Sequence, residues 1–276
     1  MCLLGTMLSG CSTLVSNARQ DFADNLSATI SESDDPETIE QALPAYMILV
    51  SSMIRSDPDN VDLLLSGAHL YSAYASIFVE NKQRQRVLAQ HAYDYASHAL
   101  CIQKPVACDA NKQSYHQYEQ TLKLFTKADV KLLFAYGGAW AGLIEANNSD
   151  WNAVADLPRV KSVLKRVVQL DENISNGDAH VYLGVLDSLI PPAMGGKPEL
   201  AKAHFEKAIK ISQGTNLMAK VLYAEKYARL VFNRELHDRL LREVVAADIG
   251  QSSHRLVDVL AQQRARKLLA NASDYF

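Results

Sequence analysis

The sequence predicts an all-α protein built as a solenoid of helical hairpins. Apolar residues recur at steps of three and four along most of its 276 residues, and the alternating pattern of a β-strand appears nowhere. Large and small residues alternate along these apolar stripes, which lets antiparallel helices approach closely. No change in composition marks a domain boundary, so a single domain of about ten to twelve helices is expected.

The clearest hairpin runs from Gly177 to Ser212. Its first helix places a leucine beside Gly184, and its second helix carries Ala201, Phe205 and Ala208 at steps of four and three. A large residue facing a small one across two antiparallel helices is the packing of a tetratricopeptide repeat (TPR) hairpin. The predicted fold class is therefore a TPR-like helical-hairpin solenoid.

The N-terminal part contains a polar segment followed by the first helices. Residues 12–35 are polar and weakly periodic, which predicts an extended tether or a marginal helix. Pro36 then begins a helix, because proline fits the first helical position, and a single TPR-like domain is expected over residues 36–276. The next helix carries Tyr46, Val50 and Met53 and ends before Asp57 and Pro58.

The remaining helices follow as hairpins. One first helix carries Leu64, Gly67, Ala68 and Tyr71, and its partner from Arg84 to Cys101 carries Ala92, Ala96 and Ala99. Further helices are expected over Asn111–Lys127, Asp129–Asn147, Leu157–Leu170, Asn216–Phe232 and Arg234–Ala247, with a capping helix over Ser252–Ala270.

The N-terminus resembles a bacterial lipoprotein signal. Leu8-Ser9-Gly10-Cys11 has small residues before a cysteine, as a lipobox does, so residues 1–11 are interpreted as the signal peptide and Cys11 as the lipid anchor. Ser12 after the cysteine suggests the outer membrane as the destination. The run is short and lacks basic residues, so we expect that residues are missing at its start or that a downstream Met was chosen. A frayed apolar tail is the alternative.

Cys101 and Cys108 bracket the end of one predicted helix. In an exported protein this spacing is compatible with a disulfide that clamps the helix end, and two buried thiols are the alternative. A metal site is disfavoured, because the nearest histidines, His98 and His116, do not have the spacing of paired ligands.

Composition and motifs argue against several function classes. The net charge of -3 and the lack of a basic block disfavour nucleic acid as a partner, and no later apolar run is long enough to span a bilayer. None of the eight histidines has another at i+4, so no helical metal pair is predicted. Gly195-Gly196-Lys197 lacks the upstream glycine of a phosphate loop, and Pro198 replaces its Ser or Thr. Neither an enzyme nor a cofactor or metal is predicted.

Several motifs follow one another in order after Asp129. They are Trp140-Ala-Gly-Leu-Ile, Asp150–Pro158, Val167–Asp171, the Pro-Pro and Gly-Gly hairpin with His204–Ala208, and Arg264–Leu269. In this order they resemble one family, the TPR-containing T component associated with TRAP transporters (the TatT type), and the resemblance is weaker before Asp129. The resemblance implies an extracytoplasmic, periplasm-facing lipoprotein, a homotrimer, and a TRAP-type periplasmic solute-binding protein as partner. It does not supply the ligand.

Two binding functions remain open. In the first, the solenoid docks the solute-binding protein and passes on a small apolar or amphipathic organic ligand; in the second, it is a general protein-binding scaffold for cell-envelope assembly. First helices line the concave side of a TPR solenoid, and their aromatic residues are candidates for an apolar cleft. A place in the core is the alternative, favoured for Tyr71 and Trp140. The candidates are Tyr71, Tyr74, Tyr136 and Trp140, with Tyr74 the best of them.

The spacing between paired helices points to a binding edge. In a repeat of about 34 residues, only a short segment separates the last apolar position of the first helix from the first small position of the second helix. The segments from Tyr71 to Ala92 and from Trp140 to Val160 are longer than this, and each excess falls at the turn of a hairpin. Stacked hairpins place equivalent turns along one edge, so this edge is predicted to be the trimer seam or the docking surface for the solute-binding protein. Longer helices are the alternative. The predicted edge residues are Trp151, Ile190, Pro191, Pro192, Met194, Gly195 and Gly196.

Overall fold

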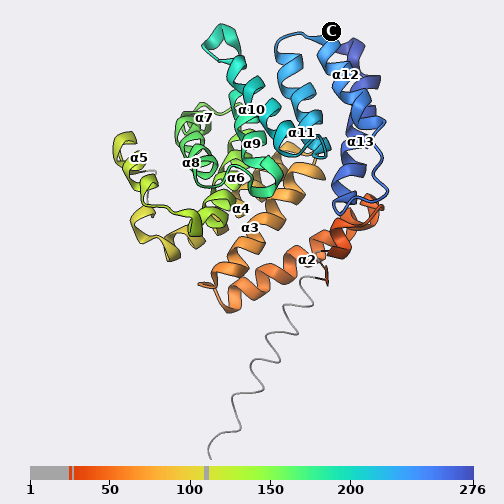
Figure 1. Ribbon diagram of the computed structural model, residues 1–276. Helices are drawn as coiled ribbons and strands as arrows, with labels where there is room; N and C mark the ends of the chain where they lie inside the picture. Colours follow the sequence, from red (N-terminus) through yellow and green to blue (C-terminus); the bar gives the residue numbers. More distant parts are fainter. Residues whose placement is uncertain (1–24, 27, 109–111) are drawn as a thin grey trace, which may run out of the picture.

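The computed structural model describes residues 25–26, 28–108 and 112–276 of the chain. In this part every regular element is a helix and no strand occurs, which confirms the predicted all-α helical-hairpin fold (Figure 1). The helices are α2 (Pro36–Ser56), α3 (Val61–Ile77), α4 (Lys82–Gln103), α5 (Tyr115–Lys123), α6 (Val130–Ala146), α7 (Trp151–Ala155), α8 (Leu157–Leu170), α9 (Asp178–Asp187), α10 (Pro198–Ile211), α11 (Leu217–Leu222), α12 (Arg234–Val245) and α13 (Arg255–Ala270).

Consecutive long helices pack as antiparallel pairs. The pairs are α3 with α4, α6 with α8 and α9 with α10. In the last hairpin α11 continues as a π-helical turn, η6 (Tyr223–Ala228), before α12 returns along it. Short 3₁₀ turns join several of these helices: η1 (Pro105–Ala107), η3 (Lys127–Asp129), η4 (Ile174–Gly177), η5 (Pro192–Met194) and η7 (Ala272–Asp274).

The N-terminal helix differs from the prediction. Two helices were expected between Pro36 and Ser56, but α2 is continuous and contains Pro44. A proline inside a helix removes one hydrogen bond, and here burial of one whole face offsets that loss. The expected stripe included Met53, which is exposed, since the buried face lies elsewhere on the helix. That face consists of Ile39, Leu43, Met47, Val50 and Ile54.

Two further boundaries differ from those predicted. The helix expected over Asn111–Lys127 is only α5, which begins at a capping box formed by Ser114 and Gln117. Residues 28–31, expected to be tether or marginal helix, are helical, and Ile30 packs against the α2 cluster. The predicted signal peptide with Cys11 lies outside the described residues.

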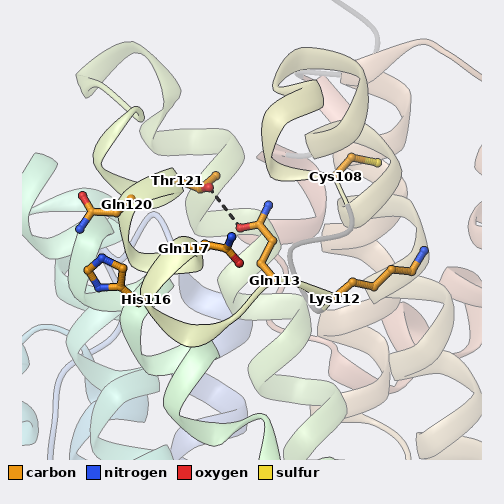
Figure 2. Close-up of a pocket in the computed structure, with 7 residues that line it drawn as sticks. All are labelled: Cys108, Lys112, Gln113, His116, Gln117, Gln120 and Thr121. Atoms are coloured by element: carbon orange, nitrogen blue, oxygen red, sulfur yellow. Dashed lines mark hydrogen bonds between the residues drawn. The ribbon is translucent and has the colours of Figure 1, made fainter.

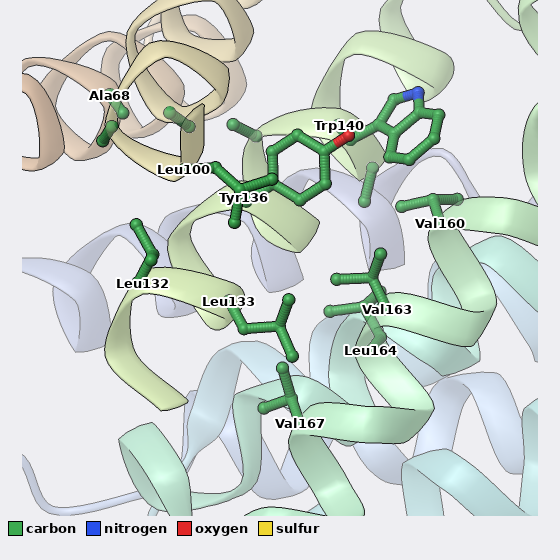
Figure 3. Packing of buried hydrophobic residues seen from close by; sticks show 14 of the residues in the cluster. Ala68, Leu100, Leu132, Leu133, Tyr136, Trp140, Val160, Val163, Leu164 and Val167 are labelled. Carbon is green, nitrogen blue, oxygen red and sulfur yellow. The ribbon is translucent and has the colours of Figure 1, made fainter. Parts of the chain in front are cut away.

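The core forms where first helices meet second helices. In Figure 3, Leu133 of α6 faces Val163 and Leu164 of α8, and all three are buried. Glycines on the first helices allow this approach: a Cβ on Gly184 would lie 2.9 Å from Cε2 of Phe205, and one on Gly137 would lie 3.0 Å from Cδ2 of Leu164. The predicted packing of small residues against large ones is present in both hairpins.

The last helix packs against the first. Leu256 of α13 shares a buried cluster with Leu43 and Met47 of α2 (Figure 1). Nearby, Lys267 Nζ lies 3.1 Å from Glu80 Oε1, which joins α13 to the turn after α3. The row of hairpins therefore curves until its two ends touch.

Substitution of Trp140 tests whether this side chain belongs to the core. Only 2% of its surface is exposed, so Trp140→Ala is expected to lower the free energy of unfolding by about 3–5 kcal/mol in urea denaturation. The matched control is Trp151→Ala, because Trp151 is 70% exposed and its loss leaves no cavity. Equal effects of the two substitutions would contradict the assignment.

Candidate functional site

Three of the hairpin turns and the end of the chain share one feature. In Figure 1 the α9–α10 turn, the turn before α12 and the end of the chain are at the top, while α7 lies lower, on the left. Each contributes an exposed large apolar side chain. We call this set the turn edge: Trp151 (70% exposed), Met194 (57%), Phe232 (74%) and Tyr275 (46%).

Backbone constraints shape the α9–α10 turn. Gly195 has a φ of +86°, which favours glycine. A Cβ on Gly196 would lie 1.8 Å from the carbonyl oxygen of Ile190, so any side chain there would displace the turn. The exposed Pro191 and Pro192 lead into the short η5 turn, at whose end Met194 is held outward. Ile190 was predicted to be exposed, but it is half-buried because it packs against the core.

A second turn presents Trp151. The carboxylate of Asp150 accepts a hydrogen bond from the backbone N–H of Asn152 and so caps α7. Arg86 of α4 donates from Nε to the carbonyl oxygen of Ala146 and from Nη2 to Ser149 Oγ, at 3.2 and 3.3 Å. These contacts fix the turn to the body of the protein while Trp151 faces solvent.

Sequence reasoning missed the other two members of the edge. Phe232 stands in the turn before α12 with a φ of +53°, and its ring stacks on Tyr275 at a centroid distance of 6.3 Å. The guanidinium of Arg229 lies 4.7 Å from the Tyr275 ring centroid. The signal for Phe232 was present, since a large apolar residue directly before the capping Asn233 falls in a hairpin turn.

The aromatic residues proposed for a cleft belong to the core instead. Tyr74, Tyr136 and Trp140 are all buried, and the rings of Tyr136 and Trp140 are 5.4 Å apart. Tyr71 is half-buried, and its hydroxyl lies 2.8 Å from Ser51 Oγ of α2. Burial leaves Tyr74, Tyr136 and Trp140 little surface for a ligand, and a place for Tyr71 in a cleft stays a prediction.

A different aromatic pair lies between two of the first helices. Phe134 of α6 and Tyr182 of α9 meet edge to face at 5.8 Å, and a Cβ on Gly142 would meet nothing within 4 Å. Tyr182 is half-buried, and burial raises the pKa of its phenol. We call Phe134, Gly138, Gly142 and Tyr182 the inner face.

Polar groups flank the inner face. Lys226 Nζ of η6 lies 2.6 Å from Glu145 Oε1 of α6, so this pair spans α9. Asp178 accepts a hydrogen bond from Asn216 Nδ2 at 2.8 Å, and burial raises the pKa of its carboxyl. The region therefore combines an aromatic surface with a few charged groups, which suits non-covalent binding of an amphipathic molecule.

A histidine pair joins the two helices of the central hairpin. Nδ1 of His180 on α9 lies 2.8 Å from Nδ1 of His204 on α10. A hydrogen bond between these two Nδ1 atoms requires a proton on one of them and a lone pair on the other. The ring that accepts the hydrogen bond is therefore neutral. Burial lowers the pKa of both rings, that of His204 to about 4, and for His204 the charges of His180, Lys165 and Lys161 add to this effect while Asp187 opposes it.

Further charged groups surround the pair. Glu172 Oε1 lies 3.5 Å from His180 Nε2, and Glu172 also pairs with Lys207 at 3.0 Å. Asp187, whose Oδ2 is 3.9 Å from His204 Nε2, forms an ion pair with Lys161. The arrangement holds α9 and α10 together at neutral pH. Among the described residues, no group of three or more His, Cys, Asp or Glu side chains could hold a metal ion.

The two cysteines lie beside an open pocket. Cys101 and Cys108 are joined by a disulfide across the end of α4 in the structure, and their oxidation in the exported protein stays a prediction. The pocket has a volume of about 500 Å³, and three glutamines and Thr121 are among its lining residues (Figure 2). Thr121 Oγ1 donates to Gln113 Oε1 at 3.1 Å within it. The pocket residues are Cys108, Lys112, Gln113, His116, Gln117, Gln120 and Thr121.

The lowered pKa of His204 predicts how the free energy of unfolding depends on pH. Its pKa is lower in the folded protein than the usual 6.5, so its contribution is complete above pH 6.5 and is lost as the pH falls toward 4. Between pH 7 and pH 5 this amounts to about 2 kcal/mol. His204→Gln keeps a polar side chain but removes the titration, so in urea denaturation its free energy of unfolding should change less between these pH values. An unchanged pH dependence would contradict the assignment.

Comparison with known proteins agrees with this architecture. The family described as TRAP transporter T-component matches residues 32–276. An uncharacterized protein of Treponema pallidum (strain Nichols) is 23% identical over 266 residues, which cover 89% of this chain and 81% of that protein. None of the helices in the described part of the chain is long and apolar enough to cross a membrane. With a family match over nearly its whole length, this all-α chain belongs to the TRAP transporter T-component family.

Proposed function

We propose that this T component is an extracytoplasmic, lipid-anchored TPR protein that docks a periplasmic TRAP-type solute-binding protein through the turn edge. The observation that carries the proposal is the exposure of Trp151, Met194 and Phe232, one from each of three hairpin turns. Tryptophan and other aromatic residues supply much of the binding energy at protein interfaces. More than half of the surface of each of these side chains is left open by the packing of the chain.

The surroundings of the turn edge suit a partner that binds and leaves. A small pocket of about 290 Å³ lies between α10 and the start of α12, and it is lined by Tyr223 and Tyr227 of η6 together with charged residues. The charged lining residues include Lys202, Glu206 and Arg239. Mixed charges around apolar anchors keep both proteins soluble when they separate and favour correct orientation when they meet.

The inner face is the proposed route for the ligand. Phe134 and Tyr182 offer aromatic surface, and Gly142 leaves space beside them. Glu145, Lys226 and Asp178 provide the polar groups that would orient a small apolar or amphipathic organic molecule. Binding and release need no catalysis, so the proposed role is that of a transport auxiliary without enzyme activity.

The turn edge is tested by a double substitution. Trp151→Ser with Met194→Ser removes two exposed anchors, so co-purification of the solute-binding protein from periplasm is expected to fall at least tenfold while helical content by circular dichroism stays unchanged. Leu124→Ser is the matched control, because Leu124 is also exposed but lies at the end of α5. Retention of the partner by the double variant would overturn the assignment. Recovery of an envelope-assembly complex instead would favour the general scaffold.

The anchor is tested at Cys11. If Cys11 carries the acyl chains, Cys11→Ala should release the protein from the membrane fraction and abolish labelling by radioactive palmitate. Cys2→Ala is the control, and it should leave both properties intact. Absence of label on the unmodified chain would contradict the lipoprotein assignment.

A further inference from the structure

A row of four titratable side chains crosses the α9–α10 hairpin. Glu172 Oε1 lies 3.5 Å from His180 Nε2, and His180 Nδ1 lies 2.8 Å from His204 Nδ1. On the other side of His204, its Nε2 lies 3.9 Å from Asp187 Oδ2. We call these four residues the proton row. The side chains of His180 and Asp187 are almost completely buried, so the row belongs largely to the interior of the protein.

Lysines of α8 and α10 pair with the two carboxylates of the row. Lys207 of α10 lies 3.0 Å from Glu172 Oε2, and its hydrogen bond lowers the pKa of the Glu172 carboxyl. Lys161 of α8 forms an ion pair with Asp187 at the other end. Lys165, also on α8, adds a positive charge beside the row. Both carboxylates are therefore ionised, and an ionised carboxylate accepts hydrogen bonds but donates none.

The row needs one hydrogen more than two neutral imidazoles supply. It has three gaps, from carboxylate to ring, from ring to ring and from ring to carboxylate. Each gap needs one hydrogen, because a carboxylate oxygen and an unprotonated ring nitrogen offer only lone pairs. Two neutral imidazoles carry two ring hydrogens between them. Whichever ring donates across the 2.8 Å contact therefore turns an unprotonated nitrogen toward its own carboxylate.

The distances agree with this count. The contact between the two rings has the length of an ordinary hydrogen bond, whereas the two outer distances, 3.5 and 3.9 Å, are longer than one. His180 Nε2 and Asp187 Oδ2 are both buried and have no hydrogen-bond partner among the described residues. Buried polar atoms without a partner are uncommon and unfavourable, so one added proton would relieve this arrangement.

We propose that the proton row is a proton-sensing site, which binds one proton in acid and then shortens its two outer distances. With one added proton each of the three gaps has a hydrogen and becomes a hydrogen bond. A second added proton is opposed, because both Nδ1 atoms would then carry a hydrogen at 2.8 Å and two positive rings would face each other. Burial lowers the pKa of both rings, which keeps the row in its neutral form at pH 7.

Shortening of the row would act on the α9–α10 turn. Asp187 is the last residue of α9, and the turn that presents Met194 follows it directly. Its two neighbours in the network, His204 and Lys161, belong to α10 and α8, so a shorter His204–Asp187 distance changes how three helices meet at the start of this turn. Acidity around the protein would in this way reach the turn edge. An effect on docking rests on the proposed function, whereas uptake of the proton does not.

Proton uptake is measured by NMR on the full chain in detergent, with nitrogen-15-labelled histidine, because the nitrogen signals distinguish a protonated ring nitrogen from an unprotonated one. As the pH falls from 7 to 4, the number of added protons on His180 and His204 together is expected to rise toward one and not beyond it, while the hydrogen bond between the two Nδ1 atoms persists. Uptake of two protons over this range, uptake of none, or independent titration of the two rings would overturn the proposal.

The count of hydrogens is tested by Glu172→Gln. The new amide N–H donates to His180 Nε2 and fills the first gap without a proton from solvent. In the unmodified chain the methyl signal of Met194 is expected to shift with pH together with the histidine signals, and in Glu172→Gln this shift should disappear. A Met194 signal that does not respond in the unmodified chain, or that responds equally in the variant, would overturn the proposal.

Two controls accompany this measurement. Lys207→Gln removes the same Glu172–Lys207 ion pair but keeps the carboxylate, so the response of Met194 to pH should persist. The methyl group of Met53 is exposed on α2, outside the hairpin, and should not follow the titration in any of these chains. No solute-binding protein takes part in either measurement, so the outcome is independent of whether docking occurs at the turn edge.

Discussion

Close approach between the two helices of each hairpin is the constraint on which the rest of the structure depends. A Cβ on Gly184 would force Phe205 to shift, and a Cβ on Gly137 would displace the end of Leu164 by a few tenths of an ångström. Such close contacts hold the separation and register of the paired helices. Each turn then spans the fixed distance between the two helices of its hairpin, and any residues beyond those needed for this lie outside the core. Trp151 and Met194 are exposed because they belong to such longer turns.

The sequence was sufficient to predict the elements but only part of the surface. Stripes such as Ala201, Phe205 and Ala208 are local, and their spacing alone predicts which side of a helix is buried. Tyr74 shows the limit, because it lies on the side of α3 next to α2 and α13, and that neighbourhood depends on how the whole row of helices curves. Tyr182 was missed for the same reason, because the ring that it contacts, Phe134, lies on a helix far from it in sequence.

The contact of α13 with α2 limits how this protein can unfold and evolve. Linear repeat arrays unravel from their ends and tolerate the gain or loss of whole repeats, since each repeat touches only its neighbours. Here Leu256 and the Lys267–Glu80 pair join the two ends. Fraying at one terminus would expose apolar surface at the other, which makes melting of the terminal helices cooperative. An additional hairpin at either end would have to displace the contact between α13 and α2.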